Sequence, residues 1–155
     1  MIKINYFIIA LLVFAVAAVG GWFTSQGLGE WYDSLIKPAW TPDGGMIGLV
    51  WTIIFILTAI SAVIVYNWSI NDWRWSLAIK LFVLNGLLNI FWSYLWFVQH
   101  ALGWALIEMI ILEVTVVAIM ILIFPRSKLA TLLLLPYAGW VAFATYLAFS
   151  IWQLN

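Results

Sequence analysis

Long apolar stretches, separated by short polar segments, make up most of the chain. Five of them extend over about 20 residues, the length a helix needs to cross the roughly 30 Å hydrocarbon core of a bilayer. None shows the alternating polarity that is typical of membrane barrel strands. The pattern therefore predicts an all-α membrane protein, a five-transmembrane-helix bundle. The predicted helices cover residues 5–25, 46–66, 75–98, 104–124 and 129–152.

These helices leave no room for a second folding unit. The only long connection is the segment 26–45, and no repeat or change in composition marks a boundary, so residues 1–155 are predicted to form a single domain. The fourth helix contains Glu108 and Glu113 and ends before Pro125, which cannot continue a helix. A charged carboxylate at membrane depth costs about 2.5 to 3.5 kcal/mol. We therefore expect Glu113 to face protein or to be protonated, with a dimer or proton-relay role as the alternative.

Small residues recur every four positions in the first predicted helix. Ala17, Gly21 and Ser25 form a stripe of this kind. Small side chains allow two membrane helices to approach closely. The stripe therefore predicts the packing face of this helix.

Composition supports a membrane location and excludes several kinds of chemistry. The chain is 67% hydrophobic and 8% charged, has no net charge, and contains no cysteine and a single histidine, His100. A soluble domain would carry about 25% charged residues. Without cysteine or a histidine cluster, no disulfide, thiolate nucleophile or metal site is expected. The balanced charge likewise predicts no nucleic-acid partner, so membrane lipid is the expected surroundings.

The cations predict how the helices are oriented. With five spans, Lys3, Arg74, Lys80, Arg126 and Lys128 fall on one side of the membrane, and only Lys37 falls on the other. Positive residues are enriched in cytoplasmic segments. We therefore expect the N-terminus inside and the loop 26–45 and the C-terminus outside. The chain has no Arg-rich amphipathic presequence, which favours a bacterial cytoplasmic membrane.

Several tryptophans lie too deep for the interfacial belt in which indole rings usually gather. Of the twelve, Trp51, Trp92 and Trp140 fall more than one turn inside predicted helices. Asn85 and Asn89 share a helix face with Trp92, so this face should point into the bundle. The stripe fits either hydrogen bonding between helices or an aromatic cavity that binds a flat apolar ligand.

The loop 26–45 has an unusual aromatic content. Trp31, Tyr32 and Trp40 occur there beside Lys37, Pro38 and Pro42. Aromatic side chains in a long connection argue for ordered structure rather than a flexible linker. We expect Lys37, Pro38, Trp40 and Pro42 to belong to a lid over the cavity.

Several separated motifs resemble the TspO family, the tryptophan-rich sensory proteins of bacteria and the mitochondrial translocator proteins. The resemblance extends over essentially the whole chain. It rests on Trp31-Tyr32, Lys37-Pro38, Trp40-Thr41-Pro42, Trp51, Asn89 with Trp92 and Phe97, Gly103-Trp104-Ala105-Leu106, Pro136-Tyr137 and the run from Trp140 to Leu147.

The resemblance implies a receptor or sensor with five spans and frequent homodimers. It implies a cavity under the first loop for porphyrin or haem-type tetrapyrroles and for benzodiazepine-type or isoquinoline drugs. No obligatory cofactor is expected. The sequence offers no nucleophile and base pair, metal cluster or nucleotide loop, so no catalytic residues are assigned. A porphyrin-degrading enzyme and a tetrapyrrole transporter are the alternatives. The ligand positions implied by the resemblance are Trp31, Tyr32, Trp51, Phe55, Asn85, Asn89, Phe91, Trp140 and Ala144. Two positions depart from the family pattern: Glu108 replaces an aspartate, and no basic residue follows Tyr146.

Overall fold

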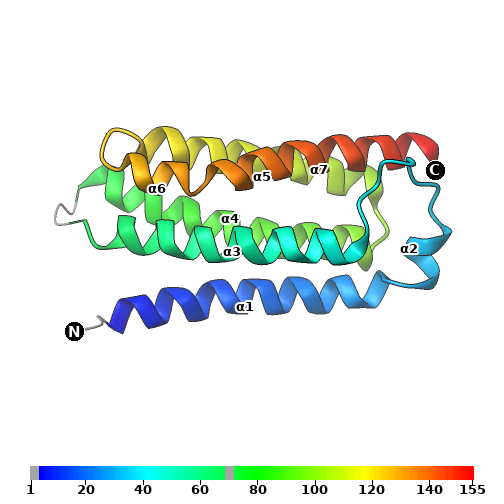
Figure 1. The fold of residues 1–155 in the computed structure, drawn as a ribbon, viewed down its shortest axis with the longest axis horizontal. Helices are drawn as coiled ribbons and strands as arrows, with labels where there is room; N and C mark the ends of the chain where they lie inside the picture. Colours follow the sequence, from blue (N-terminus) through cyan, green and yellow to red (C-terminus); the bar gives the residue numbers. More distant parts are fainter. Residues whose placement is uncertain (1–3, 69–71) are drawn as a thin grey trace.

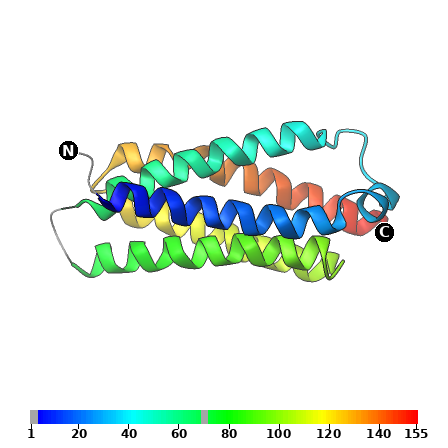
Figure 2. The same ribbon diagram turned by 90° about the horizontal axis from the view of Figure 1, so that it is seen from below.

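The protein is a bundle of long helices that lie roughly side by side (Figures 1 and 2). A computed structural model describes residues 4–68 and 72–155. In this part of the chain, five helices are long and apolar enough to cross a membrane, with α6 and α7 together making the fifth span. The predicted fold class is therefore confirmed. The helices are α1 (Ile4–Gly27), α2 (Glu30–Ser34), α3 (Gly44–Tyr66), α4 (Trp73–Phe97), α5 (Leu102–Ile123), α6 (Lys128–Leu132) and α7 (Leu135–Leu154).

Polar side chains define where three of the helices begin. Asp43 accepts a hydrogen bond from the backbone N–H of Met46 at the start of α3, over 3.0 Å. Asp72 does the same for Trp75 at the start of α4, also over 3.0 Å. Ser127 caps α6 through the N–H of Ala130. These caps satisfy backbone donors that have no partner within the helix.

The fifth predicted helix, 129–152, is divided in the structure. A turn at Leu133 and Leu134 separates α6 from α7. Pro136 lies in the first turn of α7 and has no N–H. The carbonyl of Leu132 therefore lacks the donor that a continuous helix would place four residues later, and the chain starts a new helix instead.

The helices form a closed ring in the order α3, α1, α4, α5 and α7, with α3 also packed against α6 and α7. Helix α5 contributes the most buried face, which includes Met109, Leu112, Val116 and Ile119. Glu108 lies on the same face with only 4% of its surface exposed, and neither carboxyl oxygen has a hydrogen-bond partner among the described residues. Glu113 is half-buried, so Glu108 is the more enclosed of the two acids.

Helix α1 packs through a different face from the one that the sequence predicts. Gly21 and Ser25 are exposed, and a Cβ added to Gly21 would meet nothing within 4 Å. The close contact is made by Gly27, where an added Cβ would lie 2.4 Å from the carbonyl oxygen of Phe97. The prediction that Ala17, Gly21 and Ser25 form the packing face of this helix was wrong. Small residues also occur on its other face, so their spacing alone does not identify the face that packs.

Two polar contacts fasten the helix ends at which the N-terminus lies. Asp72 and Arg126 form an ion pair that joins the start of α4 to the connection after α5, and the guanidinium of Arg126 lies 5.4 Å from the ring of Trp68. Nearby, Asn5 donates to the side chain of Asn67 over 2.9 Å. We call this end of the bundle the clip end and the opposite end, which carries α2, the loop end.

The ion pair makes stability depend on pH. The Arg126 guanidinium, helped by the backbone N–H of Trp75, lowers the pKa of the Asp72 carboxyl from 3.8 to about 2. Because the pKa is lower in the folded state, the stabilisation is complete above pH 4 or so and is lost as the pH falls towards 2. Asp72→Asn keeps the helix cap but removes the charge. We expect it to lower the thermal midpoint at neutral pH, with the difference disappearing near pH 2.

The matched control is Glu30→Gln, which removes an exposed carboxylate at the loop end. Thermal unfolding in detergent micelles, measured by circular dichroism across the pH range, gives the comparison. Equal effects of the two variants would show that the ion pair does not fasten the helix ends.

Candidate functional site

A small aromatic cavity lies at the loop end between α3, α4, α5 and α7. Its volume is about 80 Å³. Tyr32 from α2 reaches the same space. We call this the aromatic cavity. It is lined by Tyr32, Ile47, Trp51, Trp92, Trp96, Phe97, Met109, Trp140, Ala144, Leu147, Ala148 and Ile151.

The rings of this wall pack against one another rather than stand free. Trp92 stacks on Trp96 with ring centroids 5.8 Å apart, and Trp140 packs on Phe143 at 5.3 Å. However, the indole N–H groups of Trp92 and Trp140 are buried and have no hydrogen-bond partner among the described residues. A buried donor without a partner costs about 1 to 3 kcal/mol. Both residues line the aromatic cavity, so its wall contains two buried hydrogen-bond donors without partners.

The segment 28–43, which we call the lid, lies at the same end of the bundle as the cavity and contributes Tyr32 to its wall. It contains the short helix α2, seen at the same end as the C-terminus in Figure 1. The ring of Trp31 stacks on His100 at 4.0 Å and lies edge-on to Phe97 at 6.3 Å. Trp40 stacks on Tyr146 of α7 at 5.5 Å. The lid is thus held by aromatic contacts on both sides of the cavity, and the expectation of an ordered loop agrees with this arrangement.

Hydrogen bonds fix the backbone of the lid. The ammonium group of Lys37 donates to the carbonyls of Tyr32 and Leu35, over 2.5 and 3.2 Å, at the end of α2. The carbonyl of Pro38 accepts from both the N–H and the hydroxyl of Thr41. Pro42 directly precedes the residue that caps α3. The lid residues named from the sequence therefore belong to one folded segment.

Asn155 joins the lid to the end of α7. Its side-chain oxygen accepts from the N–H of Ile36, and its amide donates to the carbonyl of the same residue, both over 3.0 Å. The amide also donates to Ile151 in α7 over 2.8 Å. One side chain thus holds both backbone groups of a lid residue, in the way that a neighbouring strand would.

Tyr32 presents a phenol to the cavity. Burial, together with the nearby carboxylate of Asp33, raises the pKa of its hydroxyl above the usual value for a phenol. The phenol therefore stays protonated at neutral pH and remains able to donate a hydrogen bond.

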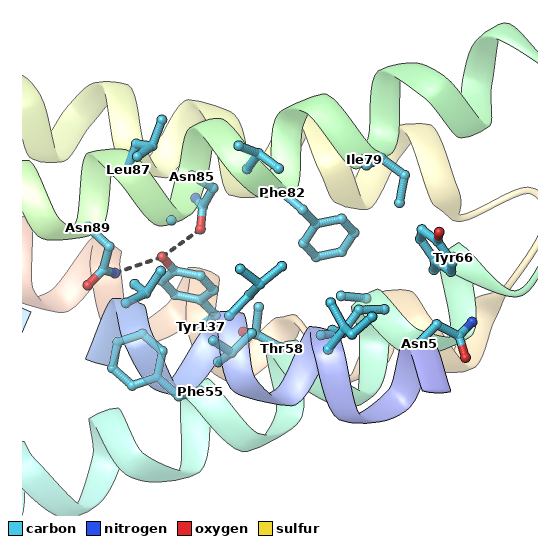
Figure 3. Close-up of a pocket in the computed structure, with 18 residues that line it drawn as sticks. Asn5, Phe55, Thr58, Tyr66, Ile79, Phe82, Asn85, Leu87, Asn89 and Tyr137 are labelled. Carbon is cyan, nitrogen blue, oxygen red and sulfur yellow. Dashed lines mark hydrogen bonds between the residues drawn. The ribbon is translucent and has the colours of Figure 1, made fainter. Parts of the chain in front are cut away.

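The two predicted asparagines take part in a hydrogen-bond chain at mid-depth in the bundle. Asn89 donates to the hydroxyl of Tyr137 over 3.0 Å, and that hydroxyl donates to Asn85 over 2.8 Å (Figure 3). Asn85 in turn donates to Thr115 over 2.8 Å, and Thr115 donates to the carbonyl of Leu112. The sequence left two interpretations open for these amides, hydrogen bonding between helices or a ligand cavity. In the structure, both amides form hydrogen bonds between helices.

The predicted ligand residues fall into separate groups. Tyr32, Trp51, Trp140 and Ala144 line the aromatic cavity, while Trp31 packs behind it on His100. Phe55, Asn85 and Asn89 line a second cavity between α1, α3 and α4.

Phe91 is placed differently from the prediction. It is 48% exposed on the outer face of α4, where it stacks on Tyr94. Because it lies one or two positions from Asn89 and Trp92, it falls on the other side of the helix and lines neither of the two cavities.

Sequence reasoning assigned no site role to Tyr137 or Asn155. Tyr137 is 4% exposed, and its ring lies edge-on to Trp51 at 6.0 Å, so it touches the cavity wall and the hydrogen-bond chain. Tyr137 precedes Trp140 by three residues, and Trp140 precedes Ala144 by four, so all three lie on one helix face. This spacing could have identified Tyr137 from the sequence. Nothing in the sequence pairs Asn155 with Ile36.

The fold and the site define a class: a helical membrane protein with five spans and a tryptophan-lined cavity beside a folded loop. The chain belongs to the TspO/MBR family, whose profile matches residues 8–153. It is 36% identical to the Tryptophan-rich protein TspO of Chlorobaculum tepidum over 146 residues, 93% of this chain and 91% of the relative. The protein of the same name from Archaeoglobus fulgidus is 37% identical, with 94% and 93% covered.

The similarity extends to animal proteins. The Translocator protein of Homo sapiens is 29% identical over 132 residues, which covers 84% of this chain and 77% of the relative. Membership of this family supports a role as a membrane sensor or receptor.

The contact between Asn155 and Ile36 predicts how the lid opens. Asn155→Ala removes two hydrogen bonds from the lid, each worth about 0.5 to 1.5 kcal/mol. We expect hydrogen exchange at residues 31–41 to become about tenfold faster, because local opening costs less. Gln153→Ala, at an exposed position of the same helix end, is the control. If both variants exchange like the parent protein, the lid is held by its aromatic contacts alone.

Proposed function

We propose that this protein is a membrane receptor or sensor that binds a flat aromatic ligand in the aromatic cavity. The ligand class is a tetrapyrrole of the porphyrin or haem type, with benzodiazepine-type and isoquinoline drugs as molecules of related shape. Family membership supports the receptor role. The observation that carries the proposal is the pair of buried, unpartnered indole donors of Trp92 and Trp140 in an otherwise aromatic wall.

The wall suits a ligand with two chemical features. Aromatic rings gain stabilisation by offset or edge-on stacking at centroid distances of about 4.5 to 7 Å, which favours a planar conjugated ligand. The indole donors, together with the phenol of Tyr32, favour a ligand that also carries acceptors. The carboxylates of a porphyrin and the carbonyl groups of the drugs meet both requirements.

The volume of the cavity supports a binding mechanism in which the lid moves. Sites for drug-sized ligands usually enclose about 300 to 1,000 Å³, whereas the aromatic cavity encloses about 80 Å³. A porphyrin therefore enters only after the lid and the rings beneath it move apart. The affinity observed is then the intrinsic affinity reduced by the fraction of molecules with an open lid.

The charges at the two ends support an orientation in a bacterial cytoplasmic membrane. Arg74 lies in the first turn of α4, and Arg126 and Lys128 lie between the end of α5 and the start of α6, at the clip end, whereas Lys37 follows α2 at the loop end. By the tendency of positive residues to stay inside, the clip end faces the cytoplasm. The lid and the aromatic cavity then face the outside, where a ligand arrives without crossing the membrane.

Replacing Trp140 tests the ligand site. We expect Trp140→Leu to weaken binding of protoporphyrin at least tenfold, about 1.4 kcal/mol, because both the stacking surface and a donor are lost. Fluorescence-quenching titrations of the purified protein measure the affinity. Trp104→Leu changes a tryptophan that is 70% exposed and is the matched control, for which the affinity should stay that of the parent protein.

The same titrations separate a receptor from an enzyme. A porphyrin spectrum that shifts and then stays constant in darkness and in light supports the receptor. Loss of the porphyrin bands over repeated turnovers would instead favour the porphyrin-degrading enzyme. Equal affinity of both tryptophan variants and the parent would remove the aromatic cavity as the site.

The orientation has its own test, made simple by the absence of cysteine from the sequence. We expect cysteines introduced at Ser34 and Gln153 to react with a membrane-impermeant thiol reagent added to intact cells. A cysteine at Ser69, which lies outside the described residues but between the second and third spans in sequence, should react only after the cells are opened. The reverse pattern would invert the proposed orientation.

A further inference from the structure

A second and larger cavity lies between α1, α3 and α4, towards the clip end (Figure 3). Its volume is about 360 Å³. Asn5 and Tyr66 line one end and Asn89 and Tyr137 the other, as the close-up shows. We call this the inner cavity. It is separate from the aromatic cavity, and an inference about it goes beyond the proposed function.

The length of the inner cavity matches one leaflet of a bilayer. Along α3 its lining extends from Phe55 to Tyr66, which corresponds to about 16 Å at 1.5 Å per residue. The hydrocarbon core of a bilayer is about 30 Å thick, so the chains of one leaflet extend about half as far. The cavity also runs along the helices, the direction that lipid chains take.

The middle of the cavity wall is apolar except for Thr58, whose buried hydroxyl has no hydrogen-bond partner among the described residues. Ile9, Val13, Ala62, Ile79 and Phe82 line it between the two polar ends, and no charged side chain belongs to its lining. At the mid-depth end, Asn85 and Tyr137 already bond to each other, and Asn85 also bonds to Thr115. At the clip end, by contrast, the side-chain oxygen of Asn5 is buried and lacks a donor among the described residues.

The cavity is open to the surroundings of the bundle. Among its lining residues, Ile8 is 48%, Leu12 60%, Val83 58% and Leu87 60% exposed. All four lie in membrane-spanning helices, so the neighbouring solvent is hydrocarbon. An empty apolar space forfeits the dispersion contacts of its lining atoms. A hydrocarbon chain from the bilayer restores those contacts without having to leave water.

We propose that the inner cavity binds a single acyl chain. The chain lies along α3 with its methyl end near Tyr137 and its polar end near Asn5 and Tyr66, where the tyrosine hydroxyl can donate to a carboxyl or ester oxygen. A fatty acid and the tail of a phospholipid share this chemistry. The apolar faces of α1, α3 and α4 that line the cavity thus form a lipid site distinct from the general lipid contact of the bundle surface.

Photo-crosslinking tests this site. The whole protein is reconstituted in lipid nanodiscs with a palmitic acid that carries a diazirine at mid-chain or, in a second arm, with a phosphatidylcholine that carries the same chain. Mass spectrometry of the peptides then locates the adducts. We expect saturable labelling of inward-facing residues such as Ile9 and Ala62, to at most one chain per protein. Saturation by only one of the two probes identifies the source of the chain.

Variants that fill the cavity provide the decisive comparison. Ala62→Leu adds three carbon atoms to a wall residue that is 8% exposed. Because these atoms displace two or so methylene groups of the bound chain, we expect labelling of the inner cavity to fall about tenfold or more. Ala10→Leu adds the same atoms at an exposed position of α1 and should label like the parent protein. Val13→Phe fills the cavity from α1, in case Ala62→Leu folds poorly by circular dichroism.

The result is independent of the proposed function, because porphyrin titrations of the same variants report on the aromatic cavity separately. The proposal is overturned if adducts at Ile9 and Ala62 increase linearly with probe and never saturate. It is also overturned if both well-folded filling variants label as strongly as Ala10→Leu. Labelling only of outward-facing residues would assign every bound chain to the bundle surface.

Discussion

A chain of hydrogen bonds between Asn89, Tyr137, Asn85 and Thr115 holds the centre of the bundle together. These side chains come from α4, α5 and α7, which are far apart in sequence. In a bilayer, polar contacts between helices contribute about 0.6 kcal/mol each on average, but a partner left unpaired in an apolar interior costs about 1 to 3 kcal/mol. These hydrogen bonds therefore mainly specify how the three helices align with one another, because other registers would leave amides unpaired. Their position also sets the boundary between the two cavities, since the ring of Tyr137 faces Trp51 while Tyr137 also lines the inner cavity.

The two cavities illustrate different uses of the same helices. The aromatic cavity is small, rich in tryptophan and bordered by a lid held through Trp31, Trp40 and Asn155. The inner cavity is larger, mostly apolar and open to the membrane. A small site with unpaired donors in an aromatic wall favours a specific ligand with matching acceptors, whereas a larger apolar site that borders the membrane favours the abundant chains of the bilayer.

Much of the fold follows from the sequence, because membrane spans are specified by long apolar runs. The predicted starts at 46, 75 and 104 lie two residues after the observed starts of α3, α4 and α5, partly because Asp43 and Asp72 cap helices earlier than the apolar runs begin. Contacts between residues that are distant in the sequence were harder to predict. The roles of Asn85 and Asn89 depend on Tyr137 and Thr115, and the packing face of α1 depends on where Phe97 lies. Two other features could have been predicted from the sequence, because they depend on local geometry. The outward position of Phe91 follows from the helical period, and the break before α7 follows from Pro136.

The bond between Asn155 and Ile36 has a practical consequence for handling the protein. Both hydrogen-bonding groups of a lid residue are held by a side chain that follows α7 directly. An affinity tag fused immediately after Asn155 would place new backbone and its charges beside the lid, whereas the N-terminal end of α1 lies at the opposite end of the bundle. Ligand affinities measured on a carboxyl-terminal fusion therefore include the work of rearranging this junction, and an amino-terminal fusion avoids it.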